Sequence, residues 1–299
     1  TSMTSCFPVI NEQCPSSQQL YHNTQTVNSQ ILTANQQVED NLVEGDVFVS
    51  NTRNARICKN CRWPKLLKTV KVPYVLSGSF TRPEKIQIEN AISAFHMSTC
   101  IRFVTRTGQT DYISIVKLNG CWSWVGRTGR SQYLSLGTGC LQKGIIQHEL
   151  IHALGFWHEQ SRNDRDAFIR INFGNILKGR ERNFKRMDTN NLNVPYDYTS
   201  VMHYAPKDFS KNSGDTITPI DASAQIGQRD GMSENDILKI NKLYVCSKYT
   251  NKAVRSIGNI LTMLTVTHPV NVPSSYSGLP PCIQRVGQYV GEHVQSHLS

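Results

Sequence analysis

Three histidines in one short stretch have the spacing that a metal ion needs. His148 and His152 are four positions apart, so on a helix both imidazoles project from the same face and can reach one ion. Gly155 can adopt the left-handed conformation that ends a helix, and the following turn can bring His158 back as a third ligand. Three protein nitrogens leave one position on zinc open for water, which is typical of a catalytic site. We therefore predict one Zn²⁺ per chain.

Glu149 directly follows the first of these histidines and predicts hydrolytic chemistry. Zinc lowers the pKa of water to about 7 and polarises a carbonyl group, while a neighbouring carboxylate can take the water proton and pass it to a leaving amine. A helix whose histidines share this spacing by chance is the alternative, but it would also need the glycine and the third histidine at fixed offsets. We predict a zinc endopeptidase with Glu149 as its general base.

Local patterns predict the elements that must position these residues. The zinc helix is expected at about 141–154, and the chain beyond it is loop-rich. Thr81 and Glu84 predict a capping box that starts an earlier helix, and Ser233 and Asp236 start a last one. The expected apolar face of the earlier helix comprises Ile88, Ala91, Ile92 and Phe95, and the expected strands are 72–76, 101–104, 112–116 and 133–136.

A second motif, residues 200–204, lies downstream of the histidines. The histidine run is the metzincin signature, and metzincin peptidases need a methionine-containing turn under the zinc, for which Met202 is the candidate. Tyr204 could offer its phenol to the metal or to a developing oxyanion. An isolated Met or Tyr is more often a packing residue. We expect His203 to be structural, because the third ligand is already supplied.

From about Asn54 to Cys246 the sequence resembles the astacin family of metzincins. Astacins carry a glutamate after the third histidine, which is Glu159 here, and residues 200–204 are similar to their Met-turn. The resemblance implies an α+β fold of two subdomains, a twisted upper sheet with helices above a mostly irregular lower half, with the zinc cleft between them. It also implies that Tyr204 is a mobile zinc ligand that stabilises the transition state.

Within this family the chain is most similar to the egg-envelope-directed branch, the hatching enzymes and related six-cysteine astacins of fish. Residues 188–193 and 195–198 fit that branch. The resemblance implies protein substrates, with egg-envelope glycoproteins as candidates, while a digestive or matrix role competes. Nucleic-acid binding is not expected, because no basic cluster is interleaved with aromatic residues. A catalytically silent zinc module of an egg coat or matrix is the alternative function, but such a module would usually have lost Glu149 or a ligand.

Nine cysteines predict an oxidising compartment and hence a secreted protein. Cys58 and Cys61 form a C-x-x-C motif, for which we favour a small structural disulfide over a redox motif or half of a zinc site. The resemblance implies the pairs Cys100–Cys246 and Cys121–Cys140, and a Cys6–Cys14 pair would leave Cys282 odd.

The first 53 residues are expected to be a propeptide ahead of a peptidase domain at 54–246. They carry a net charge of −4 against +14 for the rest, which suggests an intramolecular partner or an acidic substrate, a solvated surface being the alternative. Residues 1 to about 40 are polar and are expected to form a poor core. Astacins are cut just ahead of the catalytic domain, so a trypsin-like protease is expected to cut after Arg53, unless this arginine is only an exposed loop residue. The ammonium group of Asn54 would then approach Glu159 through water.

Residues 43–46 have the spacing of the Phe-x-Gly-Asp motif that keeps astacin precursors inactive, with Val43 in place of phenylalanine. The resemblance implies that Asp46 binds the zinc in place of water, with Gly45 letting the backbone pass close to the metal. A type II turn in a surface loop is the alternative. The valine would weaken the hydrophobic anchor of the motif.

Residues 247–299 form a tail with scattered Pro, Ser and Gly, which we expect to be extended or disordered. The longest apolar run, 260–266, is far shorter than the ~18–20 residues that cross a bilayer, so no membrane span is expected. We expect a monomer.

Overall fold

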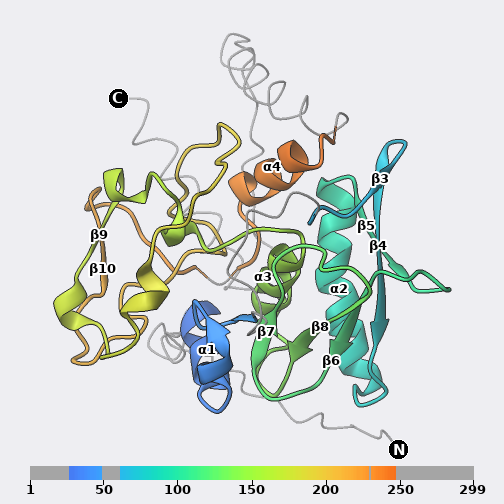
Figure 1. The fold of residues 1–299 in the computed structure, drawn as a ribbon, viewed down its shortest axis with the longest axis horizontal. Helices are drawn as coiled ribbons and strands as arrows, with labels where there is room; N and C mark the ends of the chain where they lie inside the picture. Colours follow the sequence, from blue (N-terminus) through green and yellow to red (C-terminus); the bar gives the residue numbers. More distant parts are fainter. Residues whose placement is uncertain (1–26, 49–60, 229, 247–299) are drawn as a thin grey trace, which may run out of the picture. The chain divides into compact units, whose positions relative to one another are not determined.

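The computed structural model describes residues 27–48, 61–228 and 230–246 (Figure 1). The predicted strands, capped helices and zinc helix are all present, with ends shifted by a few residues. No helix among the described residues is long and apolar enough to cross a membrane. Asn54, Cys58, Arg53, the other N-terminal cysteines and the tail lie outside the described residues, so the expectations that concern them stay predictions.

A largely parallel sheet forms one half of the peptidase region. β4 pairs in parallel with β5 and β6, β6 pairs in parallel with β8, and β7 runs antiparallel to β8. A short strand from the N-terminal end of the chain, β2, adds in parallel to β7. The strands of the sheet are β1 (Leu42–Val43), β2 (Val47–Phe48), β3 (Lys65–Leu66), β4 (Thr69–Leu76), β5 (Ile101–Thr105), β6 (Tyr112–Val116), β7 (Cys121–Ser123) and β8 (Ser131–Leu136).

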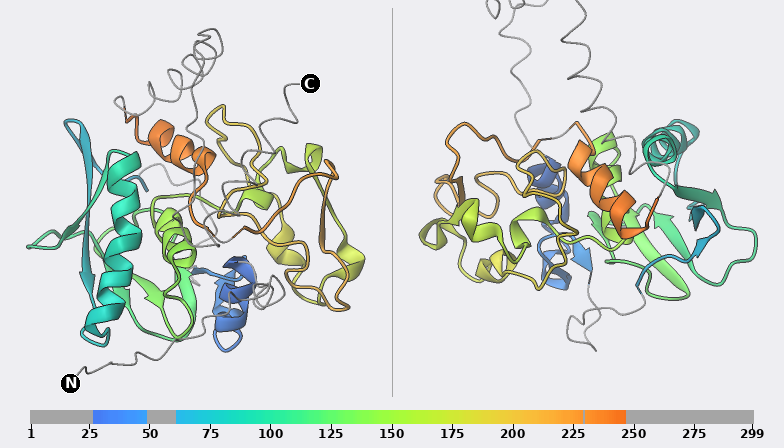
Figure 2. Two further views of the ribbon diagram at one scale, coloured as in Figure 1. Left: turned by 180° about the vertical axis from the view of Figure 1, so that it is seen from behind. Right: turned by 90° about the horizontal axis from the view of Figure 1, so that it is seen from above.

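Helices α2 (Arg82–Ser98) and α3 (Lys143–Ala153) pack on the same face of this sheet (Figure 2). The capping box predicted for α2 is present, with the Thr81 N–H donating to the Glu84 carboxylate at 2.9 Å. The predicted apolar face of α2 is buried against the strands. Helix α3 is buried along almost its whole length, which fixes its register and therefore the position of every side chain it carries.

The second half, from Gly155 to about Gly231, is mostly irregular, as expected from its turn-rich sequence. It holds a two-stranded sheet of β9 (Ile169–Ile171) and β10 (Ile217–Pro219) and a core of its own. Helix α4 (Glu234–Leu243) starts at the predicted Ser233 capping box. The short 3₁₀ helices of the described residues are η2 (Glu39–Asn41), η3 (Glu159–Ser161), η4 (Arg165–Ala167), η5 (Phe173–Asn175) and η6 (Glu181–Phe184).

Two disulfides tie distant parts of the described chain together. Cys100, just ahead of β5, is bonded to Cys246 after α4, and Cys121 of β7 is bonded to Cys140 ahead of α3. Cys61 is also disulfide-bonded, but its predicted partner Cys58 lies outside the described residues. The first bond joins residues 146 positions apart and the second residues 19 positions apart, and such bonds stabilise a fold mainly by constraining the unfolded chain.

Residues 27–48, called here the N-terminal segment, are folded against the peptidase region. Helix α1 (Val27–Asn35), blue in Figure 1, places Ile31 fully buried in the main core. The expectation that residues 1 to about 40 contribute little to a core is therefore wrong for this helix. The N-terminal segment has too few apolar residues to form a core of its own. Ile31 is buried nevertheless, because α1 packs against the apolar surface of the peptidase region.

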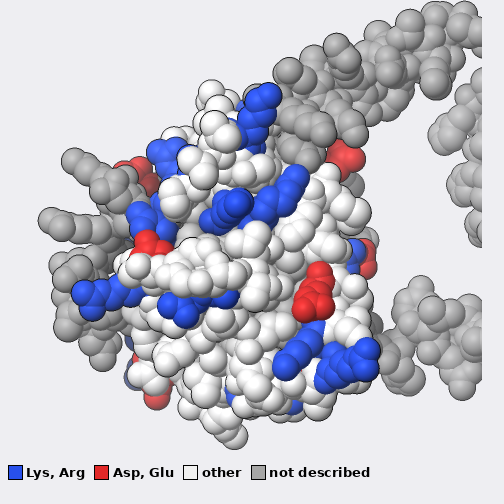
Figure 3. All heavy atoms as spheres, turned by 90° about the vertical axis from the view of Figure 1, so that its right-hand side faces the viewer, with Lys and Arg blue, Asp and Glu red and all other residues white. Residues whose placement is uncertain are grey.

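Basic side chains are dispersed over one face of the molecule (Figure 3). On the side that carries β3 to β5, Lys and Arg outnumber Asp and Glu and are separated by uncharged residues (Figure 3). This pattern agrees with a basic peptidase region, and in this view it forms no single concentrated basic patch.

Candidate metal centre

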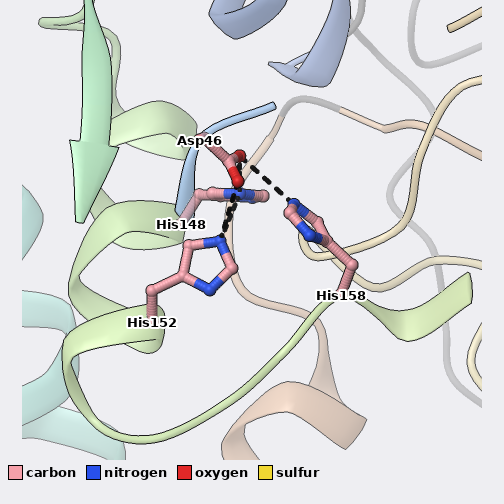
Figure 4. Close-up of side chains that lie close together, drawn as sticks. All are labelled: Asp46, His148, His152 and His158. Atoms are coloured by element: carbon pink, nitrogen blue, oxygen red, sulfur yellow. Dashed lines mark hydrogen bonds and ion pairs between the residues drawn. The ribbon is translucent and has the colours of Figure 1, made fainter. Parts of the chain in front are cut away.

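Helix α3 and the turn after it bring the three histidines together. His148 and His152 project from the same face of α3, and both are completely buried. The helix ends where Gly155 adopts φ +109, a left-handed conformation that favours glycine, and its N–H donates to the His152 carbonyl at 2.8 Å. The chain then turns back and carries His158 to the same point (Figure 4).

Asp46 from the N-terminal segment completes the group. One of its oxygens, Oδ2, lies 2.9 Å from Nε2 of His148 and 3.2 Å from Nε2 of His158. Nε2 of His152 lies 3.1 Å from that of His148 and 3.5 Å from Oδ1 of Asp46. One ligand atom from each of the four buried residues lies within 4.8 Å of the others. The group can therefore bind one metal ion.

The chemistry of these atoms fits zinc. Imidazole nitrogens and carboxylate oxygens are both zinc ligands, and four ligands are the number that zinc usually takes in proteins. Asp46 Oδ1 and both carboxylate oxygens of Glu149 are buried and have no hydrogen-bond partner among the described residues. Buried polar atoms normally have partners, so these three oxygens call for a cation or a polar ligand at this point.

The second ring nitrogens of His148 and His152 each lie against a backbone carbonyl of the peptidase region. Nδ1 of His148 lies 2.9 Å from the Val201 carbonyl, and Nδ1 of His152 lies 2.7 Å from the Phe156 carbonyl. When Nδ1 carries the proton and donates, Nε2 is left free as a ligand. The two contacts therefore fix both the ring orientation and the tautomer that metal binding needs.

Glu149 lies beside this group, next to His148 on α3. It is completely buried, and burial, followed by the nearby Asp46 carboxylate, raises the pKa of Glu149 well above its usual range. A carboxyl group held in this environment is a stronger proton acceptor than one in water. Its position beside the metal-binding group suits a general base.

Tyr204 and Met202 lie in the turn predicted from residues 200–204. The Tyr204 ring packs 4.9 Å from the His158 ring, centroid to centroid, and its hydroxyl donates to the Glu44 carbonyl at 2.7 Å. Burial, followed by the neighbouring carboxylates of Glu44 and Asp46, raises the pKa of Tyr204. Met202 is buried in the main core, and its carbonyl accepts the Glu159 N–H at 2.9 Å. His203 is buried and bonded to Tyr196, as a structural residue would be.

Glu159 is surrounded by cations of the peptidase region. Lys239 donates to one of its oxygens, and Arg162 lies 3.1 Å from the other, which also accepts the Asp197 N–H at 2.9 Å. Burial raises the pKa of Glu159, and Lys239 and Arg162 offset only part of this effect. Asn54, whose ammonium group was expected here, lies outside the described residues.

A comparison of the sequence with models of protein families identifies the family to which the chain belongs. The model of the peptidase family Astacin matches residues 57–245. The chain belongs to the astacin family. It is a zinc endopeptidase of the astacin fold that acts on protein substrates.

Similar astacins come from the medaka fish, Oryzias latipes. High choriolytic enzyme 2 is 50% identical over 224 residues, which cover 73% of this chain and 80% of that protein. Low choriolytic enzyme is 45% identical over 227 residues, covering 74% and 84%. The solved structure of high choriolytic enzyme 1, described as a hatching enzyme zinc-protease, matches with a TM-score of 0.62 and 51% identity over 64% of this chain and 100% of that one.

Sequence reasoning missed several residues of this astacin's centre. Glu44 occupies the variable position of the Phe-x-Gly-Asp motif, so no role was predicted for it. In the structure it is buried and contacts His158 and Ser161. Asn35 and Lys239 belong to no sequence motif. Folding places Asn35 against β7 and Lys239 against Glu159. A charged residue at the variable position of the motif was the one signal that the sequence offered.

The turn that carries Asp46 is not the type II turn that was the alternative to a zinc switch. Glu44 and Gly45 both have positive φ, +52 and +81, whereas a type II turn needs this at one position only. A Cβ on Gly45 would meet Leu32 Cδ2 at 2.5 Å and Phe209 Cζ at 2.9 Å, so the close approach at this glycine is to packed side chains. The buried apolar residues of the hairpin are Leu42 and Val47, and Val43 is only half-buried.

Proposed function

We propose that the chain is the latent precursor of a secreted astacin endopeptidase, and that Asp46 keeps it inactive by taking the zinc position that water needs. The supporting observation is the approach of Asp46 Oδ2 to within 2.9 and 3.2 Å of the ligand nitrogens of His148 and His158. A carboxylate oxygen there would be a fourth ligand. The catalytic zinc site would then have no open position.

The proposed catalytic roles belong to residues around this group. His148, His152 and His158 would hold the zinc, which supplies a Lewis acid that acidifies water and polarises a peptide carbonyl. Once Asp46 has left, Glu149 takes a proton from the attacking water and passes it to the leaving amine. Tyr204, released from the Glu44 carbonyl, donates its phenol hydrogen to the developing oxyanion.

The domain limits proposed are 1–53 for the propeptide, 54–246 for the peptidase domain and 247–299 for a tail. Arg53 is the single Lys or Arg among the first 53 residues, which favours it as the site of a trypsin-like activating protease. The cut would make Asn54 the first residue of the mature enzyme and let its ammonium group approach Glu159. N-terminal sequencing of the activated protein tests the site, and a start several residues away would refute it.

Egg-envelope proteins are the proposed substrates. The argument is by similarity, because the medaka relatives are named choriolytic enzymes and one is described as a hatching enzyme. The disulfides of the described chain favour an oxidising, extracellular setting. Digestion of isolated fish egg envelopes, with casein and gelatin as comparison substrates, tests the preference. Equal rates on all three would favour a general digestive or matrix role.

Latency through Asp46 is tested on the uncut chain. The unmodified precursor should not cleave a small fluorogenic peptide, while Asp46→Ala precursor should cleave it without any cut at Arg53. A small peptide is used because it can enter a cleft that bulk alone would close to proteins. An Asp46→Ala precursor that is silent until it is cut would show that the N-terminal segment blocks the cleft without a metal ligand.

A further inference from the structure

The three zinc-site histidines differ in the origin of the group that orients them. His148 and His152 are oriented by the backbone carbonyls of Val201 and Phe156, which belong to the peptidase region. Nδ1 of His158 instead lies 2.7 Å from Oε2 of Glu44, in the N-terminal segment. One ring-orienting acceptor is therefore supplied by the segment that activation would remove.

Glu44 is held firmly for this contact. Its carboxylate is completely buried, and its other oxygen, Oε1, accepts the Ser161 hydroxyl at 2.6 Å. Its backbone N–H donates to Asn183 Oδ1 at 3.1 Å, and its carbonyl accepts the Tyr204 hydroxyl at 2.7 Å. These four contacts come from three different parts of the peptidase region.

The backbone conformation at Glu44 is one that glutamate does not favour in turns, so turn propensity does not explain why a glutamate is present here. Its φ of +52 lies in the left-handed region, which asparagine or glycine adopts more readily than glutamate. Residues held in such a conformation persist where their surroundings fix them and cluster at functional sites. A glutamate in this position therefore fits a requirement for its side chain.

We propose that Glu44 is a metal-positioning residue of the precursor: it holds His158 in the orientation and tautomer that bind zinc, so the precursor retains zinc more tightly than the mature enzyme. The proposal rests on the latency proposed above. Partners of the second nitrogen of a zinc-bound histidine typically change metal affinity about 10- to 100-fold when removed. When the N-terminal segment leaves, His158 loses this acceptor at the same moment as the zinc loses Asp46.

The contribution of Glu44 is distinct from that of Asp46. Asp46 approaches the Nε2 atoms, where the metal would bind, whereas the contact of Glu44 with the zinc-site histidines is to Nδ1 of His158. Replacing Glu44 should therefore weaken zinc binding while leaving the fourth ligand and latency in place.

The experiment measures zinc affinity of the full-length precursor by competition with a chromophoric chelator. Glu44→Gly removes the carboxylate and suits the positive φ, while Glu44→Gln keeps an oxygen that can accept from His158. Glu39→Gln is the matched control. Glu39 lies in the same N-terminal segment as Glu44 and pairs with Arg180 of the peptidase region at 2.9 Å, but it contacts no zinc-site histidine. Cleavage of a small peptide by the uncut variants reports whether the segment is still docked.

We expect zinc affinity to fall about 10- to 100-fold in Glu44→Gly, less in Glu44→Gln and not at all in Glu39→Gln. The difference should vanish after the segment has been cut and separated, because the mature chains are then identical. Nδ1–H of His158, observed by NMR of zinc-loaded protein, should exchange with solvent faster in Glu44→Gly precursor and in mature enzyme than in the unmodified precursor. Unchanged zinc affinity in a docked Glu44→Gly precursor would overturn the proposal.

A second variant serves if Glu44→Gly releases the segment. Ser161→Ala removes the donor to Glu44 Oε1 from the peptidase side, so it should weaken zinc binding in the precursor and leave that of the mature enzyme unchanged. An equal effect on both forms would refute the role of Glu44. Failure of latency is a separate result: Asp46→Ala precursor that stays silent contradicts the proposed switch, while the zinc affinities still decide the role of Glu44.

Discussion

Asn35 binds Cys121 through the pair of hydrogen bonds that a neighbouring strand would make. Its Oδ1 accepts the Cys121 N–H and its Nδ2 donates to the Cys121 carbonyl, both at 2.6 Å. The same Nδ2 donates to the Gly45 carbonyl at 2.7 Å, next to Asp46. A single buried amide therefore joins helix α1, the Asp46 turn and strand β7.

Asn35→Ala should make the uncut precursor leaky. If the N-terminal segment stayed in place, the substitution would leave the buried N–H and C=O of Cys121 unpaired. Each unpaired group would destabilise this docked state by about 1–3 kcal/mol. Since about 1.4 kcal/mol is tenfold in an equilibrium constant, peptide cleavage by the uncut precursor should rise at least about tenfold. Thr33→Ala, on the exposed side of α1, is the control. Equal residual rates for the two variants would argue against Asn35 as an anchor.

Glu149→Ala should abolish proteolysis after activation while zinc stays bound. The histidines hold the metal and Glu149 moves protons, so loss of the general base should lower kcat by about 10²- to 10⁴-fold. Zinc content is measured by metal analysis and activity with a fluorogenic peptide. Glu89→Ala, on the exposed side of α2, should retain full activity. A fall in zinc content together with activity would indicate misfolding instead.

Tyr204→Phe should lower kcat of the activated enzyme by about 10- to 1000-fold with little change in KM, because the phenol would act mainly in the transition state. The ring contacts with His158 and Phe184 would be kept. Tyr198→Phe removes a hydroxyl that donates to the Phe168 carbonyl and serves as the matched control. Equal kcat values for Tyr204→Phe and the unmodified enzyme would remove Tyr204 from the mechanism.

The parts of the fold that the sequence predicted are those encoded locally. Thr81 with Glu84, and Ser233 with Asp236, bond within one helical turn, so their helix starts are readable without the rest of the chain. The histidines of α3 are readable for the same reason. The contacts of Asn35 and Glu44 join residues 86 and 114 positions apart, and no local pattern encodes them. Helix α1 was missed because its stability comes from the surface on which it packs.

The pairing of Glu159 with Lys239 leads to the last prediction. Both side chains are buried, and Arg162 is the other cation in contact with this carboxylate among the described residues. Removing one partner of a buried ion pair commonly destabilises a protein by about 3–5 kcal/mol, because the remaining charge is left uncompensated. Lys239→Met, which keeps most of the apolar length of the side chain, should therefore lower the thermal unfolding midpoint clearly.

Lys242→Met on the same helix gives the comparison. Lys242 is only half-buried and donates to the carbonyls of Leu192 and Asn193, with no acidic partner among the described residues. Its loss should therefore cost about 1 kcal/mol. Both midpoints are measured on the uncut precursor by scanning calorimetry at one scan rate, since unfolding of a disulfide-bonded protein is often irreversible. A Lys239→Met midpoint equal to that of Lys242→Met would mean that Arg162 and the Asp197 N–H suffice for Glu159. In that case Lys239 would have no special part in holding the residue that follows the third zinc-site histidine.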